Sequence, residues 1–329
     1  MLHKLYRKKG ILLIILILMI LYLFLSTITS ISTADSQNIG LLLEDTIDDH
    51  GWNRQGYEGL LSVHNQFNVD VFYKEEIKTK AEIHQAVKQL VDEHVSLIFG
   101  HGKSFSEVFS ELPNDYPQVH FVVINGDVTG ERVSSYAFDG YAMGYFAGVL
   151  SAIMSKNEQV GIIAAFPWQP EVNGFIAGVA SQNEQIDVSV EYVMSWHDLE
   201  TAKEFYEAMK KESVDILYPI GDGFHVELIE LSKRDGLYVI GYVSDQTDLG
   251  ESSVLSSTVQ HVDQVYVDVV DAFLKGKLVS GRFSLDFQDG VISMGDYSSQ
   301  VPEEVVLFIE EMVQYYIQTG EFKQVSYLP

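Results

Sequence analysis

The sequence alternates short apolar runs with longer amphipathic segments, and this alternation constrains the fold more than any other feature. Four apolar runs, bounded by Gly, Asn or Asp, are typical of buried strands and lie at residues 38–44, 70–73, 96–99 and 120–124. The segments between them have apolar residues at helical spacing and lie at residues 56–67, 80–94 and 104–112. Strands and helices in this order predict a parallel sheet that is covered by helices on both faces.

The same alternation restarts after residue 139, and the length of 329 residues also favours two lobes. Strands are expected at 160–164, 188–193, 215–218, 237–240 and 254–259, and helices at 143–154, 172–180, 199–211, 225–233, 261–274 and 302–319. Residues 283–295 are expected to form a hairpin that turns at Asp289-Gly290. We assign 35–139 plus roughly 260–282 to an N-terminal lobe and 140–259 plus roughly 283–329 to a C-terminal lobe. Two such α/β lobes imply a ligand cleft between them, at the carboxyl ends of the strands.

Residues 1–34 have the features of a membrane-targeting segment. Basic residues in 1–10 precede fifteen consecutive apolar residues at 11–25, a pattern that keeps the N-terminus in the cytoplasm. In one interpretation the segment is a cleaved signal peptide, with Ser32 and Ala34 as the small residues of the cleavage site and Asp35 as the first mature residue. In the other, residues 11–31 form an uncleaved membrane helix, because about 20 residues span a bilayer. Both interpretations locate the rest of the chain on the extracytoplasmic side of the cell membrane.

The charge and the missing cysteines exclude several functions. From residue 35 onward the chain has 17 basic and 47 acidic residues, a net charge of −30, so we expect no direct binding of nucleic acid. The absence of cysteine excludes disulfides, thiolate metal ligands and a thioether-linked lipid anchor. Sequence motifs of hydrolases and of dinucleotide-binding enzymes are missing, so we expect a protein that is not an enzyme and needs no cofactor.

The loop after the first predicted strand contains the first candidates for ligand binding, Asp49, Trp52 and Asn53. An indole beside hydrogen-bonding side chains offers a stacking face for a planar ligand. The neighbouring acidic residues and His50 do not have the spacing of a calcium loop, so a metal site is not favoured.

Three further candidates follow other predicted strands. His101 lies in a Gly-His-Gly turn that faces the cleft, and this turn is not a P-loop because Leu97 stands where the Walker pattern needs glycine. Phe224, after a Gly-Asp-Gly turn, could present a second aromatic ring opposite Trp52, although a core Phe after a glycine turn explains the same pattern equally well. The third candidate for ligand binding is Asp245, which also stands at the end of a predicted strand.

A set of motifs runs through residues 38–320 in a recognisable order. It includes D-H-G-W-N at 49–53, G-Y-E-G-L at 56–60, Y-F-A-G at 145–148, G-Y-V-S-D-Q at 241–246 and S-T-V-Q-H-V-D at 257–263. These motifs resemble those of the basic membrane protein (Bmp, PnrA-like) family, purine-nucleoside-binding lipoproteins of ABC importers. The resemblance implies a type I periplasmic-binding-protein fold with two Rossmann-like lobes, a purine nucleoside as ligand and an ABC permease as partner.

The resemblance also implies roles for individual residues. Asp49, Trp52 and Phe224 keep the positions of the family's ribose and stacking groups. Val243 stands where the family commonly has Asp, and Gln260, which we expect at the site, stands where it has Lys. The family's acidic positions before the Y-F-A-G motif correspond to Gly140 and Ala142. Loss of two charged hydrogen bonds, each contributing roughly 1.5–3 kcal/mol, would weaken nucleoside binding by about 100-fold or more.

Two functions follow from these observations. The first is a membrane-associated solute-binding protein that closes on a small planar ligand for uptake or sensing. The second rests on the segments 98–109, 168–172 and 218–223, which are similar to regulators of competence genes in bacilli. Such a regulator would act on gene expression indirectly, because the chain from residue 35 onward is acidic and is expected outside the cytoplasm.

Overall fold

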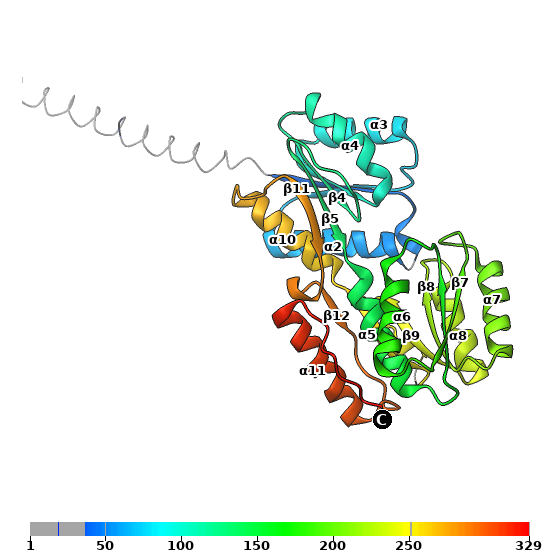
Figure 1. The fold of residues 1–329 in the computed structure, drawn as a ribbon. Helices are drawn as coiled ribbons and strands as arrows, with labels where there is room; N and C mark the ends of the chain where they lie inside the picture. Colours follow the sequence, from blue (N-terminus) through cyan, green and yellow to red (C-terminus); the bar gives the residue numbers. More distant parts are fainter. Residues whose placement is uncertain (1–18, 20–36, 50, 251, 329) are drawn as a thin grey trace, which may run out of the picture.

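Within residues 19, 37–49, 51–250 and 252–328, which the computed structural model describes, the chain forms two six-stranded sheets (Figure 1). The first sheet has the strand order β11-β5-β4-β3-β1-β2, and all its neighbouring strands are parallel, as predicted. Its strands are β1 (Asn38–Leu43), β2 (Val71–Lys74), β3 (Val95–His101), β4 (His120–Ile124), β5 (Val133–Phe138) and β11 (Gly281–Leu285).

The second sheet has the strand order β12-β10-β9-β8-β6-β7, in which only the pair of β10 and β12 is antiparallel. Its strands are β6 (Gln159–Ala164), β7 (Asp187–Tyr192), β8 (Ile216–Ile220), β9 (Tyr238–Val243), β10 (Val254–Gln260) and β12 (Ile292–Met294). We call each sheet, together with the helices that pack on it, a lobe.

Helices cover both faces of each sheet. The first lobe contains α2 (Trp52–Phe67), α3 (Lys80–Asp92), α4 (Ser106–Glu111) and α10 (Val262–Leu274). The second contains α5 (Gly140–Met154), α6 (Pro170–Gln182), α7 (Leu199–Lys211), α8 (His225–Asp235), α9 (Thr247–Gly250) and α11 (Glu303–Thr319). Short 3-10 turns are η1 (Ile47–Asp49), η2 (Lys103–Phe105), η3 (Leu112–Asn114) and η4 (Phe287–Asp289).

Each lobe has apolar cores on both faces of its sheet. In the first lobe, one core contains Leu60 of α2 and Tyr266 of α10, and the other contains Val87 of α3 and Phe109 of α4. In the second lobe, α5, α6 and α11 cover one face, and α7 and α8 cover the other. The two lobes are therefore three-layer α/β sandwiches.

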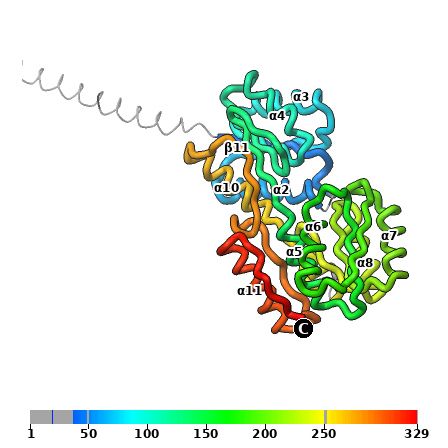
Figure 2. Tube along the Cα trace, viewed as in Figure 1, coloured from blue at the N-terminus to red at the C-terminus, as the bar shows by residue number. Residues whose placement is uncertain are grey.

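The chain passes between the lobes at three points in the described residues: from β5 into α5, from β10 into α10, and between β11 and β12. Figure 2 shows these segments side by side at the junction of the lobes. The lobe limits given above stay a prediction.

The expected hairpin at residues 283–295 is wrong. β11 pairs with β5 in the first sheet, whereas β12 pairs with β10 in the second. Asp289 and Gly290 end the 3-10 turn η4, with Gly290 in the left-handed region at φ 74°, and do not connect paired strands. Phe287, just before them, is buried in the core of the second lobe, so the chain has left the first lobe by this residue.

The helices α5 and α6 pack more closely than ordinary helices. A Cβ atom at Gly148 of α5 would lie 2.2 Å from the Phe175 carbonyl oxygen, and one at Gly178 of α6 would lie 2.0 Å from the Tyr145 carbonyl oxygen. Only glycine permits so close an approach of the two helix backbones.

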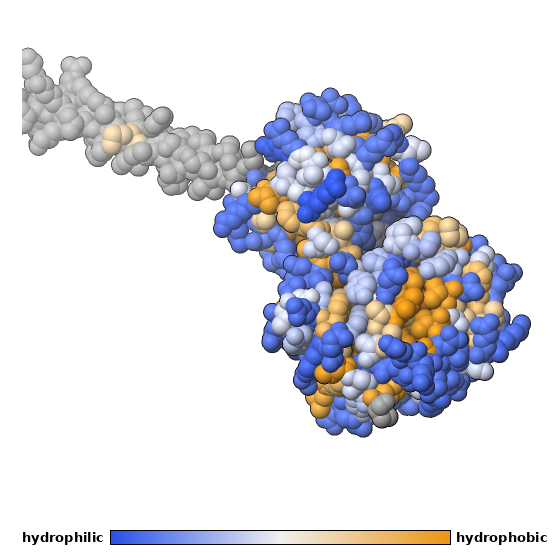
Figure 3. Space-filling model, in the orientation of Figure 1, coloured by the Kyte–Doolittle hydropathy of each residue, from blue (hydrophilic) through white to orange (hydrophobic). Residues whose placement is uncertain are grey.

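None of the helices in the described part of the chain is both long and apolar enough to cross a membrane. The membrane segment predicted within residues 1–34 lies outside the described residues, apart from residue 19. In Figure 3, hydrophilic residues cover most of the visible face of both lobes, and a hydrophobic area lies near α6, whose Ile176 is exposed.

Candidate functional site

Trp52 and His101 form a stacked pair at the carboxyl edge of the first sheet. Trp52 begins α2, directly after the loop that follows β1, and His101 is the last residue of the neighbouring strand β3. Their rings are 4.0 Å apart at an interplanar angle of 17°. The structure therefore brings together two of the predicted site residues.

Hydrogen bonds fix the imidazole of His101, which is fully buried. Its Nε2 is 2.8 Å from the Trp52 carbonyl oxygen, and its Nδ1 is 2.9 Å from the hydroxyl of Tyr266 in α10. One neutral tautomer satisfies both contacts: Nε2–H donates to the carbonyl, and Nδ1 accepts from the hydroxyl. Burial raises the pKa of Tyr266 well above its ordinary value, so the hydroxyl keeps its proton.

A hydrogen bond connects this pair to the second lobe. The backbone N–H of Trp52 donates to Oδ1 of Asp222, in the loop after β8, over 3.1 Å. Asn53, which is 5% exposed, points its Oδ1 at the backbone N–H of Asp45, 3.4 Å away. The side chain of Asp49 lies outside the described part of the structure.

Phe224 is placed in the core of the second lobe and not against Trp52. Its side chain is fully buried among residues of β6, α7 and α8, including Ile163, Tyr206 and Leu228. A Cβ atom at Gly221 would lie 2.0 Å from the Phe224 ring, so this ring packs directly against the loop that follows β8. The alternative given above, a core Phe after a glycine turn, describes this placement.

Asp245 binds the backbone around it. Its carboxylate accepts hydrogen bonds from the N–H groups of Thr247, at 3.0 Å, and Asp296, at 2.9 Å. Burial alone would raise the pKa of Asp245, but these contacts and the hydroxyls of Thr247 and Ser257 hold the pKa below its ordinary value.

Gln260, the last residue of β10, is 7% exposed, and its Nε2 lies 3.5 Å from Sδ of Met143 in α5. Among the described residues its Oε1 has no hydrogen-bond partner. A buried amide oxygen without a partner is costly, so this position has capacity for a further hydrogen bond.

Glu171, in the first turn of α6, is a buried carboxyl group that the sequence analysis missed. Its Oε1 accepts a hydrogen bond from the Tyr242 hydroxyl over 3.3 Å, while its Oε2 has no partner within the part of the chain that is described. A Cβ atom at Gly140 would lie 2.2 Å from the carboxyl carbon, so Glu171 fills the space beside this glycine. Burial raises the pKa of Glu171 to about 7.

Three aromatic rings follow β6 and β7, also at the carboxyl edge of the second sheet. Phe166 stacks on Trp168 at 5.3 Å, and Trp196 meets both rings edge-on at 5.4 and 5.8 Å. Trp168 is 65% exposed. The Trp196 carbonyl oxygen accepts a hydrogen bond from Gly223 N–H over 2.8 Å, which places this cluster beside Asp222.

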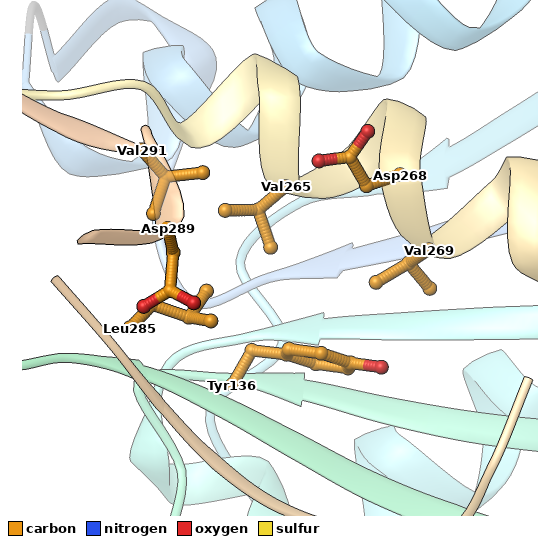
Figure 4. A pocket seen from close by; sticks show the side chains of 7 residues that line it. All are labelled: Tyr136, Val265, Asp268, Val269, Leu285, Asp289 and Val291. Atoms are coloured by element: carbon orange, nitrogen blue, oxygen red, sulfur yellow. The ribbon is translucent and has the colours of Figure 1, made fainter. Parts of the chain in front are cut away.

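Two cavities in the described part of the chain lie away from these residues. One of about 210 Å³ is between α10 and the first sheet, where Tyr136 and Leu285 face Val265 and the carboxylates of Asp268 and Asp289 stand at its sides (Figure 4). A larger groove, of about 660 Å³, follows β2 and α3. Neither contains a predicted site residue, and at Trp52 the two lobes are instead in direct contact.

A pair of α/β lobes joined by three chain crossings, with polar and aromatic side chains where the carboxyl edges meet, is the architecture of solute-binding proteins. The chain belongs to the family described as "ABC transporter substrate-binding protein PnrA-like", whose sequence profile matches residues 36–323. The family predicted from the motifs is thus confirmed.

Two curated relatives differ in what their names state. The "Transcriptional activator protein med" of Bacillus subtilis is 44% identical over 285 residues, which cover 87% of this chain and 90% of that protein. A "Purine-binding protein" of Brucella abortus is 25% identical over 289 residues, which cover 86% of this chain and 81% of that protein.

Solved structures agree with the fold. A Bacillus halodurans protein described as a "Transcriptional Activator of comK gene" is 51% identical, with a TM-score of 0.83, and the match covers 86% of this chain and 99% of that one. An ABC transporter solute-binding protein of Aeropyrum pernix matches in fold, with a TM-score of 0.74 at 17% identity, over 88% of this chain and 93% of that one. The predicted periplasmic-binding-protein fold is confirmed.

Proposed function

We propose that this protein is an extracytoplasmic, membrane-associated solute-binding protein that closes on a small planar ligand, with a purine nucleoside as the first candidate. It takes part in uptake or sensing and has no catalytic activity. The observation that carries the proposal is the Trp52–His101 stack at the carboxyl edge of the first sheet, opposite the loop of Asp222. Membership of a substrate-binding family with a purine-binding relative supports the ligand class.

The ligand contacts would come from both lobes. Trp52 offers its indole as a stacking face, while its carbonyl is held by His101. On the second lobe, Gln260 has an amide oxygen that no described residue binds, and Phe166 and Trp168 supply aromatic surface at the same edge. We therefore assign the second stacking ring to this cluster rather than to Phe224, which is fully buried. Asp49 and Asp245 remain proposed ligand residues because each follows a strand, and for Asp49 the family resemblance adds support.

Calorimetry tests this proposal with inosine, guanosine and adenosine. We expect binding of at least one nucleoside, weakened about 5- to 150-fold in Trp52→Ala, since stacking of a base on an aromatic ring contributes about 1–3 kcal/mol. Tyr73→Ala is the matched control, because Tyr73 is an exposed aromatic residue on the edge strand β2. Absence of heat for all three nucleosides at millimolar concentration would remove nucleosides as ligands.

The second candidate is a regulator of the med type, which acts on competence gene expression without binding DNA itself. The identities of 44% and 51% to proteins named as transcriptional activators favour it. The two candidates are compatible, because a ligand-binding protein outside the membrane can report its ligand to a partner. Gel-shift binding of DNA by the purified body at physiological salt would contradict indirect action, since a net charge of −30 opposes such binding.

Uptake and regulation differ in the partners that they need. Uptake requires an ABC permease with its ATPase, whereas regulation does not. Deletion of the gene followed by measurement of nucleoside uptake and of competence gene expression separates the two roles.

A further inference from the structure

The cavity of about 210 Å³ beside Tyr136 lies where the chain passes between the lobes, and each of the three crossings contributes to its lining. Tyr136 comes from β5, just before the first crossing, and Val265 comes from the first turn of α10, just after the second. Leu285 ends β11, and Val291 directly precedes β12, so the third crossing lines the cavity at both of its ends. A molecule bound in this cavity would therefore contact all three connections between the lobes.

The walls of the cavity are apolar. Val265, Val269 and Val291 are 2–3% exposed and belong to a core of the first lobe. The ring of Tyr136 stacks on Phe283 of β11 at 4.8 Å and lies across the cavity from the valines of α10 (Figure 4). A volume of about 210 Å³ equals that of several water molecules, each of which takes about 30 Å³ in the liquid. The cavity thus has room for one small organic molecule with an apolar part.

Two carboxylates stand at the sides of this apolar cavity, Asp268 of α10 and Asp289 of η4 (Figure 4). Both residues are exposed. Gln264 donates to Oδ1 of Asp268 over 2.8 Å, and the N–H of Asp286 donates to Oδ2 of Asp289 over 2.9 Å. These hydrogen bonds orient the carboxylates without neutralising their charge.

The charges around the cavity favour a cation. The basic residues that are near these aspartates in the sequence bind elsewhere, since Lys275 pairs with Asp271 and Arg282 pairs with Asp127. The net charge of −30 from residue 35 onward attracts cations as well. A metal ion does not fit, because no group of three or more His, Asp or Glu side chains among the described residues could hold one. Two carboxylates beside an apolar wall fit an organic cation with an apolar stem.

We propose that this cavity is a binding site for a short alkyl diammonium ion that connects the three crossings of the hinge. The apolar stem of the ion lies against Tyr136, Val265 and Leu285. One ammonium group lies at Asp268 and the other at Asp289. Because the ion contacts every crossing, it stabilises the arrangement of the lobes that it fits best. The site is separate from the Trp52–His101 stack and does not rest on the proposed function.

Calorimetry of the full chain at low salt tests the ligand class with cadaverine, a five-carbon diamine, and with n-pentylamine and 1,5-pentanediol. We expect cadaverine to bind and pentylamine to bind about 3- to 10-fold more weakly, because it lacks one charged contact at a partly exposed site. Pentanediol, which has no charge, should not bind. Absence of heat with millimolar cadaverine would overturn the site, and equal affinity for pentylamine would overturn the use of both carboxylates.

Variants distinguish this site from condensation of cations on an acidic surface. Asp268→Asn and Asp289→Asn keep an acceptor oxygen for the existing hydrogen bonds but remove the charge, so each should weaken cadaverine binding about 3- to 10-fold. Val269→Leu leaves the charge unchanged and fills part of the cavity, so it should weaken binding too. The matched control is Asp187→Asn, an exposed aspartate of the second sheet, which should have no effect. An equal loss in Asp187→Asn, or unchanged binding in Val269→Leu, would overturn the site.

Hydrogen exchange tests the effect on the hinge. At a cadaverine concentration ten times the dissociation constant, we expect exchange in residues 262–269 and 285–291 to slow about tenfold, because opening of these segments requires release of the ion. Unchanged exchange with cadaverine bound would overturn the connection of the crossings. These results are independent of nucleoside binding, so failure of the proposed function and failure of this site are distinguishable.

Discussion

The buried carboxyl group of Glu171 makes the stability of the protein depend on pH, and Glu171→Gln tests this. The side chain is 5% exposed, packs beside Gly140 at the start of α5, and accepts one hydrogen bond, from Tyr242. Burial raises its pKa from an ordinary value of 4.5 to about 7. The folded state therefore keeps a proton that the unfolded chain has already lost.

The direction and size of the effect follow from this difference in pKa. Because the folded-state pKa is raised, the contribution of neutral Glu171 is fully present below about pH 4.5 and is lost as the pH rises to about 7. One pKa unit corresponds to about 1.4 kcal/mol, so the free energy of unfolding should fall by about 3 kcal/mol over this range because of Glu171.

Urea denaturation of the wild type and Glu171→Gln at a series of pH values measures this contribution. We expect the wild type to lose stability relative to the variant between pH 4.5 and 7, because glutamine does not titrate. Glu200→Gln is the control, since Glu200 is also in the first turn of a helix of the second lobe but its side chain is 89% exposed. The diagnostic result is a difference in free energy of unfolding between the wild type and Glu171→Gln that changes with pH. A difference that is the same at every pH would report only the altered hydrogen bonding of the amide. Parallel stability curves for the wild type and Glu171→Gln would refute the reasoning.

Three further predictions concern the two lobes. Tyr266→Phe removes the buried hydroxyl that donates to Nδ1 of His101, so the free energy of unfolding should fall by about 1–2 kcal/mol in urea denaturation, while Tyr73→Phe, at an exposed residue of the edge strand β2, has no effect. Burial, and to a lesser extent the charge of Arg132, lowers the pKa of His120 from 6.5 to about 4. The stabilising contribution of the neutral imidazole is therefore present above pH 6.5 and is lost as the pH falls toward 4. NMR should find this imidazole neutral at pH 5.5, and a charged ring at that pH would contradict the burial argument. Gly148→Ala forces a methyl group against the Phe175 carbonyl oxygen and should destabilise the second lobe by about 1–3 kcal/mol in the same denaturation assay, and an unchanged midpoint would mean that α5 and α6 separate at little cost.

The periodic pattern of the sequence predicted the two parallel sheets, because buried strands and amphipathic helices leave strong local signals. It failed where the signal is not local. The strand β5 was missed, since it has the buried serines Ser134 and Ser135 in place of an apolar run. β11 and β12 were joined into a hairpin, because the sequence does not tell whether two neighbouring strands enter the same core.

At the candidate site, too, the sequence predicted the residues with a local signal and missed those that only tertiary packing brings in. Trp52 and His101 were predicted from their positions after strands, and their rings are in fact stacked. Tyr266 and Glu171 were missed, because each lies in an amphipathic helix where a tyrosine or a first-turn glutamate is ordinary, and only the packing of α10 and α6 turns them inward. For Phe224 the pattern allowed a core position or a stacking position, and burial against Gly221 distinguishes them.

A co-crystal structure with inosine tests the central claim, that the protein binds a planar ligand where the carboxyl edges of its two sheets meet. We predict density for the base on the free face of Trp52, with the second lobe contacting it through the Phe166 and Trp168 cluster or Gln260. Density confined to the cavity beside Tyr136, or to the groove along β2, would contradict the account.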